Sequence, residues 1–197
     1  MITDWTPETL AAFERDIADT FNRGGIRSPV HLSGGNERQL IAIFRDVQPQ
    51  DWVCGTWRAH YHCLLKGVSP DELKAAIVAG RSIALCFPEQ RVICSAMVGG
   101  IAPIALGLAW SIKRDNGRER VWCFLGDMAD TSGIVHECRR YAAGHALPIT
   151  FVVEDNGKSV STDTLEVWGW ESQDCSDYYR YNLTHSHVGT GRWVHMQ

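Results

Sequence analysis

Apolar residues recur every three or four positions through the first part of the chain, a spacing that predicts amphipathic helices. The first helix is expected to follow Thr6, whose hydroxyl suits an N-cap, and to have Pro7 in its first turn. It should end at Gly24-Gly25. The same spacing predicts helices over residues 36–46, 69–80 and 101–114, a turn into a further helix over 55–66, and a loop over 81–100.

Two runs of consecutive apolar residues predict buried strands instead. The first covers residues 121–125 and stops at Gly126-Asp127, and the second covers 148–153 and stops at the polar segment 154–157. Residues 132–145 between them have helical spacing, so the three segments form a strand–helix–strand unit with parallel strands. The tail from Val167 is rich in Trp, Tyr and His and has little periodicity. The pattern as a whole indicates an α/β fold.

Composition and charge argue against several classes of protein. The chain has 197 residues, 45% of them hydrophobic and 21% charged, which is ordinary for one globular domain and unlike a disordered chain. The formal net charge of −4 argues against a nucleic-acid partner and against a polybasic membrane anchor. The seven Cys include no C-x-x-C pair, and the N-terminus has no signal-peptide pattern. We therefore expect reduced, buried thiols and a cytoplasmic location.

An uncharged segment over residues 92–112 is long enough to cross a membrane. It is interrupted by Gly99-Gly100 and by Pro103, and it is rich in Ala and Gly. These features favour a loop followed by a buried helix, so we expect no membrane partner.

Polar residues follow both predicted strands. In a parallel sheet, ligands bind beyond the carboxyl ends of the strands, where Asp127 and Asn156 would converge if the strands are neighbours. A carboxylate and an amide oxygen suit Mg²⁺ or Ca²⁺, and Mg²⁺ keeps positions open for phosphate oxygens. In the structural alternative, Asp127 caps the next helix and Asn156 makes a tight turn. Spacing alone favours that alternative.

Further residues change the balance, because they match one family at four places in the correct order. Gly126-Asp127 and Asn156 resemble the thiamine-diphosphate motif Gly-Asp-Gly…Asn-Asn. Upstream, 31–37 resembles His-Leu-x-x-Gly-Gln-Glu, 57–60 resembles Tyr-Arg-x-His, and 98–107 resembles Val-Gly-x-x-x-Pro-x-x-x-Gly. Over residues 10–162 the chain is similar to the α-subunits of the thiamine-diphosphate-dependent 2-oxo acid dehydrogenases.

This resemblance implies a three-layer α/β/α fold with a mostly parallel sheet, the transketolase-like thiamine-diphosphate-binding fold. We expect a single domain over 1–197, with the motifs in 31–162 and an aromatic-rich tail over 163–197. The cofactors implied are thiamine diphosphate and Mg²⁺. By resemblance, the metal ligands are Asp127, the side chain of Asn156 and the backbone carbonyl of Lys158.

The resemblance also assigns residues to the rest of the cofactor. Arg58 would pair with the diphosphate, and Trp57, which replaces the family's Tyr, would offer an indole N–H. Backbone groups near Ala96 and Val98 would meet the aminopyrimidine ring, and His31 would face the substrate side of the thiazolium, as the catalytic candidate. The cofactor-binding set is completed by the residues around the Gly-Asp motif: Gly126, Met128 and Ala129.

The sequence departs from the family at several positions. Met128 stands where the motif has its third residue, a glycine that lets the backbone approach the diphosphate, and Asp155 replaces the first Asn of the pair. The chain is also short at its C-terminal end relative to the family. The glutamate that activates the cofactor lies on the family's β-subunit, whereas Glu37 and Glu137 match structural positions. We therefore expect a β-type partner and a heterotetramer of two α and two β chains.

The function implied is that of an α-like subunit acting on a 2-oxo acid or a related α-carbonyl donor, by decarboxylation or carboligation, with a small-molecule substrate. One alternative is a non-catalytic homologue that serves as a partner-binding subunit, which Met128 and the short length favour. The retention of Asp127, Asn156 and Arg58 opposes that alternative. Another alternative is half of a split transketolase-like enzyme, against which His31 and Arg58 argue.

Overall fold

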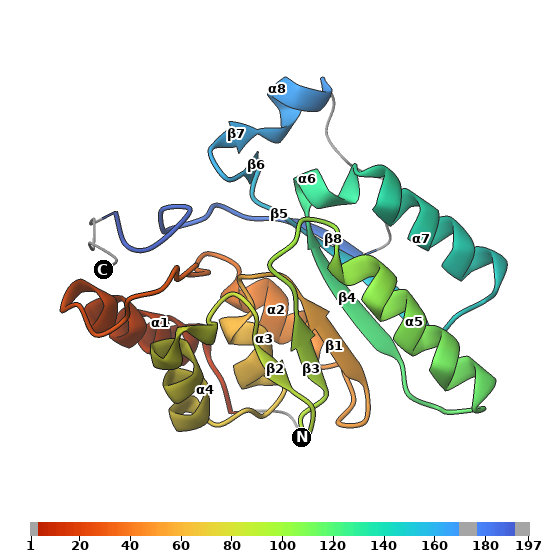
Figure 1. Ribbon diagram of the computed structural model, residues 1–197, viewed down its shortest axis with the longest axis horizontal. Helices are drawn as coiled ribbons and strands as arrows, with labels where there is room; N and C mark the ends of the chain where they lie inside the picture. The colour runs from red at the N-terminus through yellow and green to blue at the C-terminus, as the bar shows by residue number, and fades with distance from the viewer. Residues whose placement is uncertain (1–3, 170–176, 192–197) are drawn as a thin grey trace.

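The computed structural model describes residues 4–169 and 177–191, so Trp170, Cys175 and Trp193 lie outside the described residues. In this part of the chain the main sheet has the strand order β2-β3-β1-β4-β5-β8 (Figure 1). Strands β3, β1, β4, β5 and β8 are parallel to one another, and β2 is antiparallel to β3. The strands are β1 (Trp52–Gly55), β2 (Cys86–Phe87), β3 (Val92–Cys94), β4 (Val121–Gly126), β5 (Ile149–Asp155) and β8 (Asp177–Arg180).

The predicted helices form close to their expected positions. The side chain of Thr6 accepts from the backbone of Thr9, which caps the first helix at the residue that the sequence indicated. Ser69 caps a later helix in the same way, through the N–H of Glu72. The helices of this half are α1 (Pro7–Asn22), α2 (Glu37–Phe44), α3 (His60–Leu65) and α4 (Pro70–Ala76), which continues into a π-helical turn over Ile77–Arg81.

Alternating strand residues divide the core between the two faces of the sheet. Trp122, Phe124 and Val53 pack with α1 to α4, whereas Cys123, Leu125 and Cys54 pack with α5 (Ile101–Arg114) and α7 (Gly133–Gly144). Figure 1 shows α5 and α7 together on one side of the sheet and α1 to α4 on the other. The three-layer α/β/α fold with a mostly parallel sheet is therefore confirmed.

Four strands of the main sheet, β1, β2, β3 and β8, were not predicted from the sequence. Residues 52–55, placed before and within a turn, form the central strand β1, and the expected loop over 81–100 contains β2 and β3. The tail, which showed no periodicity, contributes β8 at the edge of the sheet. These strands have two to four residues each, too few to establish an alternating or continuous apolar pattern.

After β5 the chain forms a small arm above the sheet. It consists of a hairpin, β6 (Lys158–Ser159) with β7 (Thr162–Asp163), and a short helix, α8 (Thr164–Trp168). Figure 1 shows this arm above α6 (Asp127–Asp130), the turn of helix that follows β4.

The remaining expectations concern cysteines and membranes. Cys86 is exposed, while the other free cysteines among the described residues are buried: Cys54, Cys63, Cys94, Cys123 and Cys138. Within residues 4–169 and 177–191, no helix has both the length and the apolar character needed to cross a bilayer. The uncharged segment divides into β3, a loop and the helix α5, as expected from its glycines and proline.

Candidate functional site

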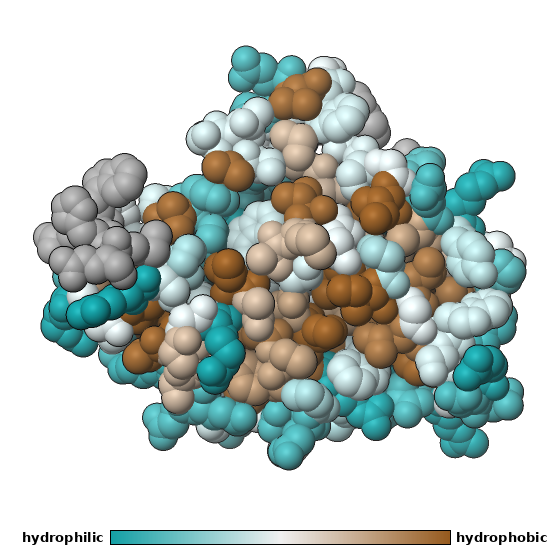
Figure 2. Space-filling view, in the orientation of Figure 1, coloured by the Kyte–Doolittle hydropathy of each residue, from teal (hydrophilic) through white to brown (hydrophobic). Residues whose placement is uncertain are grey.

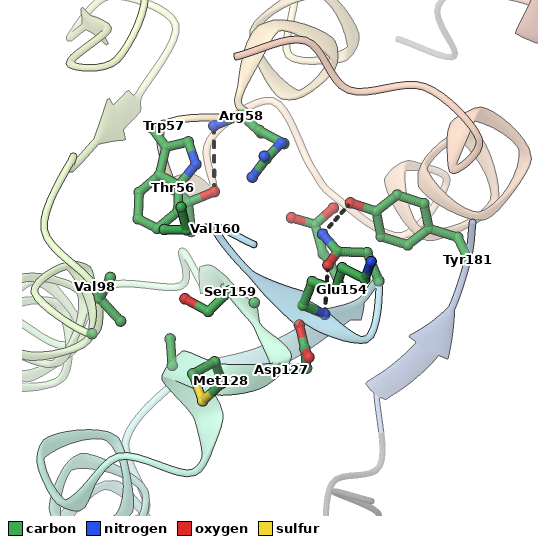
Figure 3. A pocket seen from close by; sticks show the side chains of 15 residues that line it. Thr56, Trp57, Arg58, Val98, Asp127, Met128, Glu154, Ser159, Val160 and Tyr181 are labelled. Carbon is green, nitrogen blue, oxygen red and sulfur yellow. Dashed lines mark hydrogen bonds between the residues drawn. The ribbon is translucent and has the colours of Figure 1, made fainter. Parts of the chain in front are cut away.

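A pocket lies at the carboxyl ends of the parallel strands, the place where ligands bind in open α/β sheets. Segments that follow β1, β3, β4, β5 and β8 all reach it. Figure 3 shows Trp57 and Arg58 at one end of the pocket and Asp127 and Met128 at the other. The lining residues are Thr56, Trp57, Arg58, Val98, Gly99, Gly126, Asp127, Met128, Ala129, Glu154, Asn156, Lys158, Ser159, Val160 and Tyr181.

All but two of the site residues indicated by the sequence line this pocket. Ala96 is exposed and does not line it, although its neighbour Val98 does. His31 does not line the pocket either, but its ring contacts those of Trp57 and His187, with centroids 6.0 and 4.9 Å away. The structure therefore brings the two halves of the predicted site together, and it places His31 next to the site rather than in its lining.

Asp127 is the first residue of α6 and is only 2% exposed. The hydroxyl of Thr164 donates to its Oδ2, whereas Oδ1 has no hydrogen-bond partner among the described residues. Burial, opposed by the Thr164 hydrogen bond, raises the pKa of Asp127 to about 6. An ionised carboxylate at this depth is unfavourable unless a cation lies beside it.

The other two proposed ligand positions lie on a tight turn after β5. The side chain of Asn156 accepts from the N–H of Lys158 at 3.0 Å and donates to the hydroxyl of Tyr181 at 3.3 Å. The N–H of Gly157, which has a positive φ of 76°, donates to Asp155 at 2.7 Å. Asn156 therefore makes the turn proposed in the structural alternative and still lies beside Asp127 in the pocket wall.

Two donors at the opposite end of the pocket have no partner. Trp57 Nε1 and Arg58 Nε are buried and make no hydrogen bond among the described residues. The Arg58 Nη2 donates to the backbone carbonyl of His187 at 2.9 Å and lies 3.0 Å from its ring Nδ1. Because a guanidinium only donates, Nδ1 is the acceptor, and the proton of a neutral His187 is on Nε2.

The histidines beside Arg58 are held neutral. Burial, and then the charge of Arg58, lower the pKa of His31 to about 3 and lower that of His187 as well. Arg58 also borders a second cavity of ≈ 450 Å³, which shares Asn156 and Lys158 with the first pocket. The first pocket is narrow, with a volume of ≈ 40 Å³.

Several lining residues were missed in the sequence. Tyr181 follows β8, a strand that carried no pattern, so nothing in the sequence indicated its position. Glu154 ends the predicted strand beside Asn156; it accepts from Tyr179 at 2.5 Å and from Asn36 at 3.2 Å. Thr164, which does not line the pocket but donates to Asp127, was also missed, because only the fold brings the two residues together.

The donor set fits a magnesium diphosphate. The pocket offers a carboxylate, an amide oxygen and backbone carbonyls for a hard cation, and buried N–H groups for phosphate oxygens. In the described part of the chain no group of three or more His, Cys, Asp or Glu side chains is arranged to hold a metal ion. A metal here would therefore take only one carboxylate from this chain and would need oxygen ligands from another source, as a diphosphate supplies.

Comparisons with known proteins point to one family. The family model described as "Dehydrogenase E1 component" matches residues 6–180. The α-subunit of the acetoin:2,6-dichlorophenolindophenol oxidoreductase of Cupriavidus necator is 30% identical over 164 residues, and that of Bacillus subtilis is 29% identical over 164 residues. The α-subunit of the pyruvate dehydrogenase E1 component of Porphyra purpurea is 29% identical over 161 residues.

The matches cover different shares of the two chains. They cover 78%, 78% and 73% of this chain but 49%, 49% and 47% of those relatives, so the chain spans about half their length. A solved structure of a thiamin diphosphate-dependent enzyme from Mycobacterium smegmatis matches 59% of this chain and 20% of its own, with 19% identity and a TM-score of 0.41. The assignment of the fold rests on the strand order and register and not on that match.

Proposed function

The chain belongs to the dehydrogenase E1 component family, and on that premise we propose that it is the diphosphate-binding, α-type subunit of a thiamine-diphosphate-dependent enzyme. One observation carries the proposal. Buried polar atoms without hydrogen-bond partners lie at both ends of the pocket. Asp127 Oδ1 at one end suits a cation, and Trp57 Nε1 and Arg58 Nε at the other end suit an anion, so the pocket fits a metal ion together with a diphosphate.

Mg²⁺ would be held by Asp127 Oδ1, by the side chain of Asn156 and by the carbonyl of Lys158. Arg58 and Trp57 would donate to phosphate oxygens, and the fixed guanidinium plane would set the orientation of the diphosphate. Thiamine diphosphate, when bound, would supply a nucleophilic carbon and a cationic ring that accepts the electron pair released next to a carbonyl carbon. His31, kept neutral by burial, would be able to offer a hydrogen bond beside the pocket.

The substrate proposed is a 2-oxo acid or a related α-carbonyl compound. The names of the relatives support this class, because acetoin and pyruvate both carry a carbonyl at the carbon next to the bond that is broken. Decarboxylation and carboligation both begin from such a carbonyl, and the pocket favours neither one.

A β-type partner is proposed because the described lining of the pocket offers no free carboxylate for the aminopyrimidine. Among the described lining residues, the acidic side chains are Asp127, proposed for the metal, and Glu154, which is engaged by Tyr179 and Asn36. Met97 and Val98 at the rim of the pocket are 68% and 52% exposed. Figure 2 shows hydrophobic residues gathered over the middle of this face, a surface suited to a second chain. An assembly of two α and two β chains follows the family pattern.

The competing function is that of a non-catalytic homologue that retains the fold and the partner surface. The observation in its favour is Met128, whose side chain lines the pocket where the motif has glycine. The two functions differ in a simple respect: only the first requires binding of thiamine diphosphate with Mg²⁺.

Calorimetric titration of thiamine diphosphate into the full chain, with and without Mg²⁺ and with its partner chain present, tests the proposal. We expect binding that needs Mg²⁺, and loss of binding in Asp127→Ala but not in the control Asp115→Ala, which alters the exposed carboxylate at the C-cap of α5. If Asp127→Ala binds thiamine diphosphate as tightly as the unmodified chain does, Asp127 is not a metal ligand. Absence of binding by the unmodified chain would favour the non-catalytic function.

A further inference from the structure

The short helix α8 lies beside the proposed metal site although none of its residues lines the pocket. The side chain of Asp163 caps this helix by accepting from the N–H groups of Leu165 and Glu166, at 2.9 and 3.2 Å. The indole N–H of Trp168 points to the sulfur of Met128 at 3.0 Å. The helix is therefore fixed at both ends, once to its own N-cap and once to α6.

Thr164, the first residue of α8, contacts both segments that carry the proposed ligands. Its hydroxyl donates to Asp127 Oδ2, on α6. Its backbone N–H donates at 3.0 Å to the carbonyl of Gly157, the residue between Asn156 and Lys158. Thr164 is only 5% exposed, so water does not compete freely for either hydrogen bond.

We infer that Thr164 is the positioning residue of the metal site: it fixes the distance between Asp127 and the 156–158 turn, and it presents Asp127 Oδ1 to the ion. The inference rests on the proposed function, because it concerns how the same site selects its metal. By occupying Oδ2, the hydroxyl leaves Oδ1 as the single free oxygen of that carboxylate. Asp127 would thus bind a cation through one oxygen and not through both.

This arrangement has a consequence for which cation binds. Mg²⁺ requires near-ideal octahedral geometry with short bonds, whereas Ca²⁺ accepts longer bonds, more ligands and carboxylates that bind through two oxygens. A carboxylate fixed in direction and limited to one oxygen favours Mg²⁺. Without the Thr164 hydroxyl, Asp127 could rotate and offer both oxygens, which favours Ca²⁺.

The variant Thr164→Val removes the hydroxyl and keeps the side-chain volume and the backbone N–H bond to Gly157. Thr164→Ser restores the hydroxyl, and Thr162→Val serves as a matched control on the exposed strand β7. Mg²⁺ and Ca²⁺ are titrated separately into each full-chain protein, with its partner chain present, at saturating thiamine diphosphate, and both dissociation constants are measured by calorimetry.

In Thr164→Val we expect Mg²⁺ affinity to fall by roughly 10- to 100-fold, the usual effect of losing a hydrogen bond to a metal ligand. Ca²⁺ affinity should fall by a smaller factor or rise, so the ratio of Mg²⁺ to Ca²⁺ affinity decreases. Thr164→Ser should recover most of the lost Mg²⁺ affinity, and Thr162→Val should have the same two dissociation constants as the unmodified chain.

Two results would overturn the inference: a Thr164→Val protein with unchanged Mg²⁺ affinity, or one in which Mg²⁺ and Ca²⁺ affinities fall by the same factor, as general loosening of the site would produce. Both leave the proposed function intact, because they presuppose that the unmodified chain binds thiamine diphosphate with Mg²⁺. If the unmodified chain binds neither, the proposed function itself is wrong, and the role of Thr164 falls with it.

Discussion

The buried carboxylate of Asp127 should lower the stability of the chain whenever no cation is bound. Replacing it by asparagine keeps the shape of the side chain and can keep the hydrogen bond from Thr164, because an amide oxygen also accepts. It removes the charge and places an amide NH2 group where Oδ1 lies. We therefore expect Asp127→Asn to be more stable than the unmodified chain at pH 7 in the absence of ligand, while it loses metal-dependent cofactor binding.

The magnitude follows from the pKa. Burial raises the pKa of Asp127 from its ordinary 3.8 to about 6 in the folded chain. At 1.36 kcal/mol for each pH unit, keeping this group ionised in the folded state costs about 3 kcal/mol at pH 7. For a chain of this size the corresponding rise in Tm is about 6–12 °C.

The sign of the pH dependence is also determined. Below pH 3.8 the group is protonated in both states, so its ionisation costs nothing. Between about pH 4 and 6 the unfolded chain has released the proton that the folded chain retains, and the free energy of unfolding falls as the pH rises. Above pH 6 the full penalty is present. The stability gap between Asp127→Asn and the unmodified chain should therefore be small near pH 4 and complete by pH 7.

Denaturant unfolding at pH 4, 5, 6 and 7, without ligand, measures this gap. Asp115→Asn is the matched control, because that carboxylate is exposed and its loss should change stability by less than about 0.5 kcal/mol. Adding Mg²⁺ and thiamine diphosphate at pH 7 should raise the free energy of unfolding of the unmodified chain but not that of Asp127→Asn. A gap that is absent at pH 7, or that does not change with pH, would show that Asp127 is not an unpaired buried charge.

Two further predictions concern the diphosphate and the partner. Arg58→Ala should weaken thiamine diphosphate binding by about 2–5 kcal/mol, roughly 30- to several-thousand-fold, and Arg58→Lys should recover only part of the lost affinity. The dissociation constants are measured by calorimetry with the partner chain present. Equal constants for the unmodified chain and both variants would show that Arg58 does not bind the diphosphate. The purified chain alone should show no turnover of 2-oxo acids, because the described lining of its pocket has no free carboxylate for the aminopyrimidine. Robust CO₂ release by the purified chain would show that no partner is needed.

The parts of the fold that the sequence predicted are those long enough to show a pattern. Helices α1, α5 and α7 have 16, 14 and 12 residues, so each buries a face that repeats. Strands β4 and β5 have six and seven residues, enough for a run of consecutive apolar residues. Strands β1, β3 and β8 gain their hydrogen bonds from neighbours far along the chain. Their three or four residues carry no local signal, because tertiary pairing and not local pattern selects the strand.

The same difference explains which parts of the site were predictable. Asp127 and Asn156 follow the two predicted strands, and the register that pairs Gly126 with Glu154 brings their ends together, as expected of parallel neighbours. Arg58 could be placed only by resemblance, since the strand before it was missed. The structure supplies the physical reason: β1 lies directly beside β4, so the segment after β1 opens onto the same edge of the sheet.

Met128 is the departure from the family motif that most favours a non-catalytic function, but its surroundings in the structure weaken that argument. It lies within the helical turn α6, where the backbone conformation is open to any residue, so a glycine is not required there for its φ. What glycine would add is room beside the diphosphate. The sulfur of Met128 is instead turned toward the indole of Trp168, on the helix whose first residue holds Asp127. The methionine is therefore accommodated by the element that orders the carboxylate, which is the opposite of what a decaying site should show.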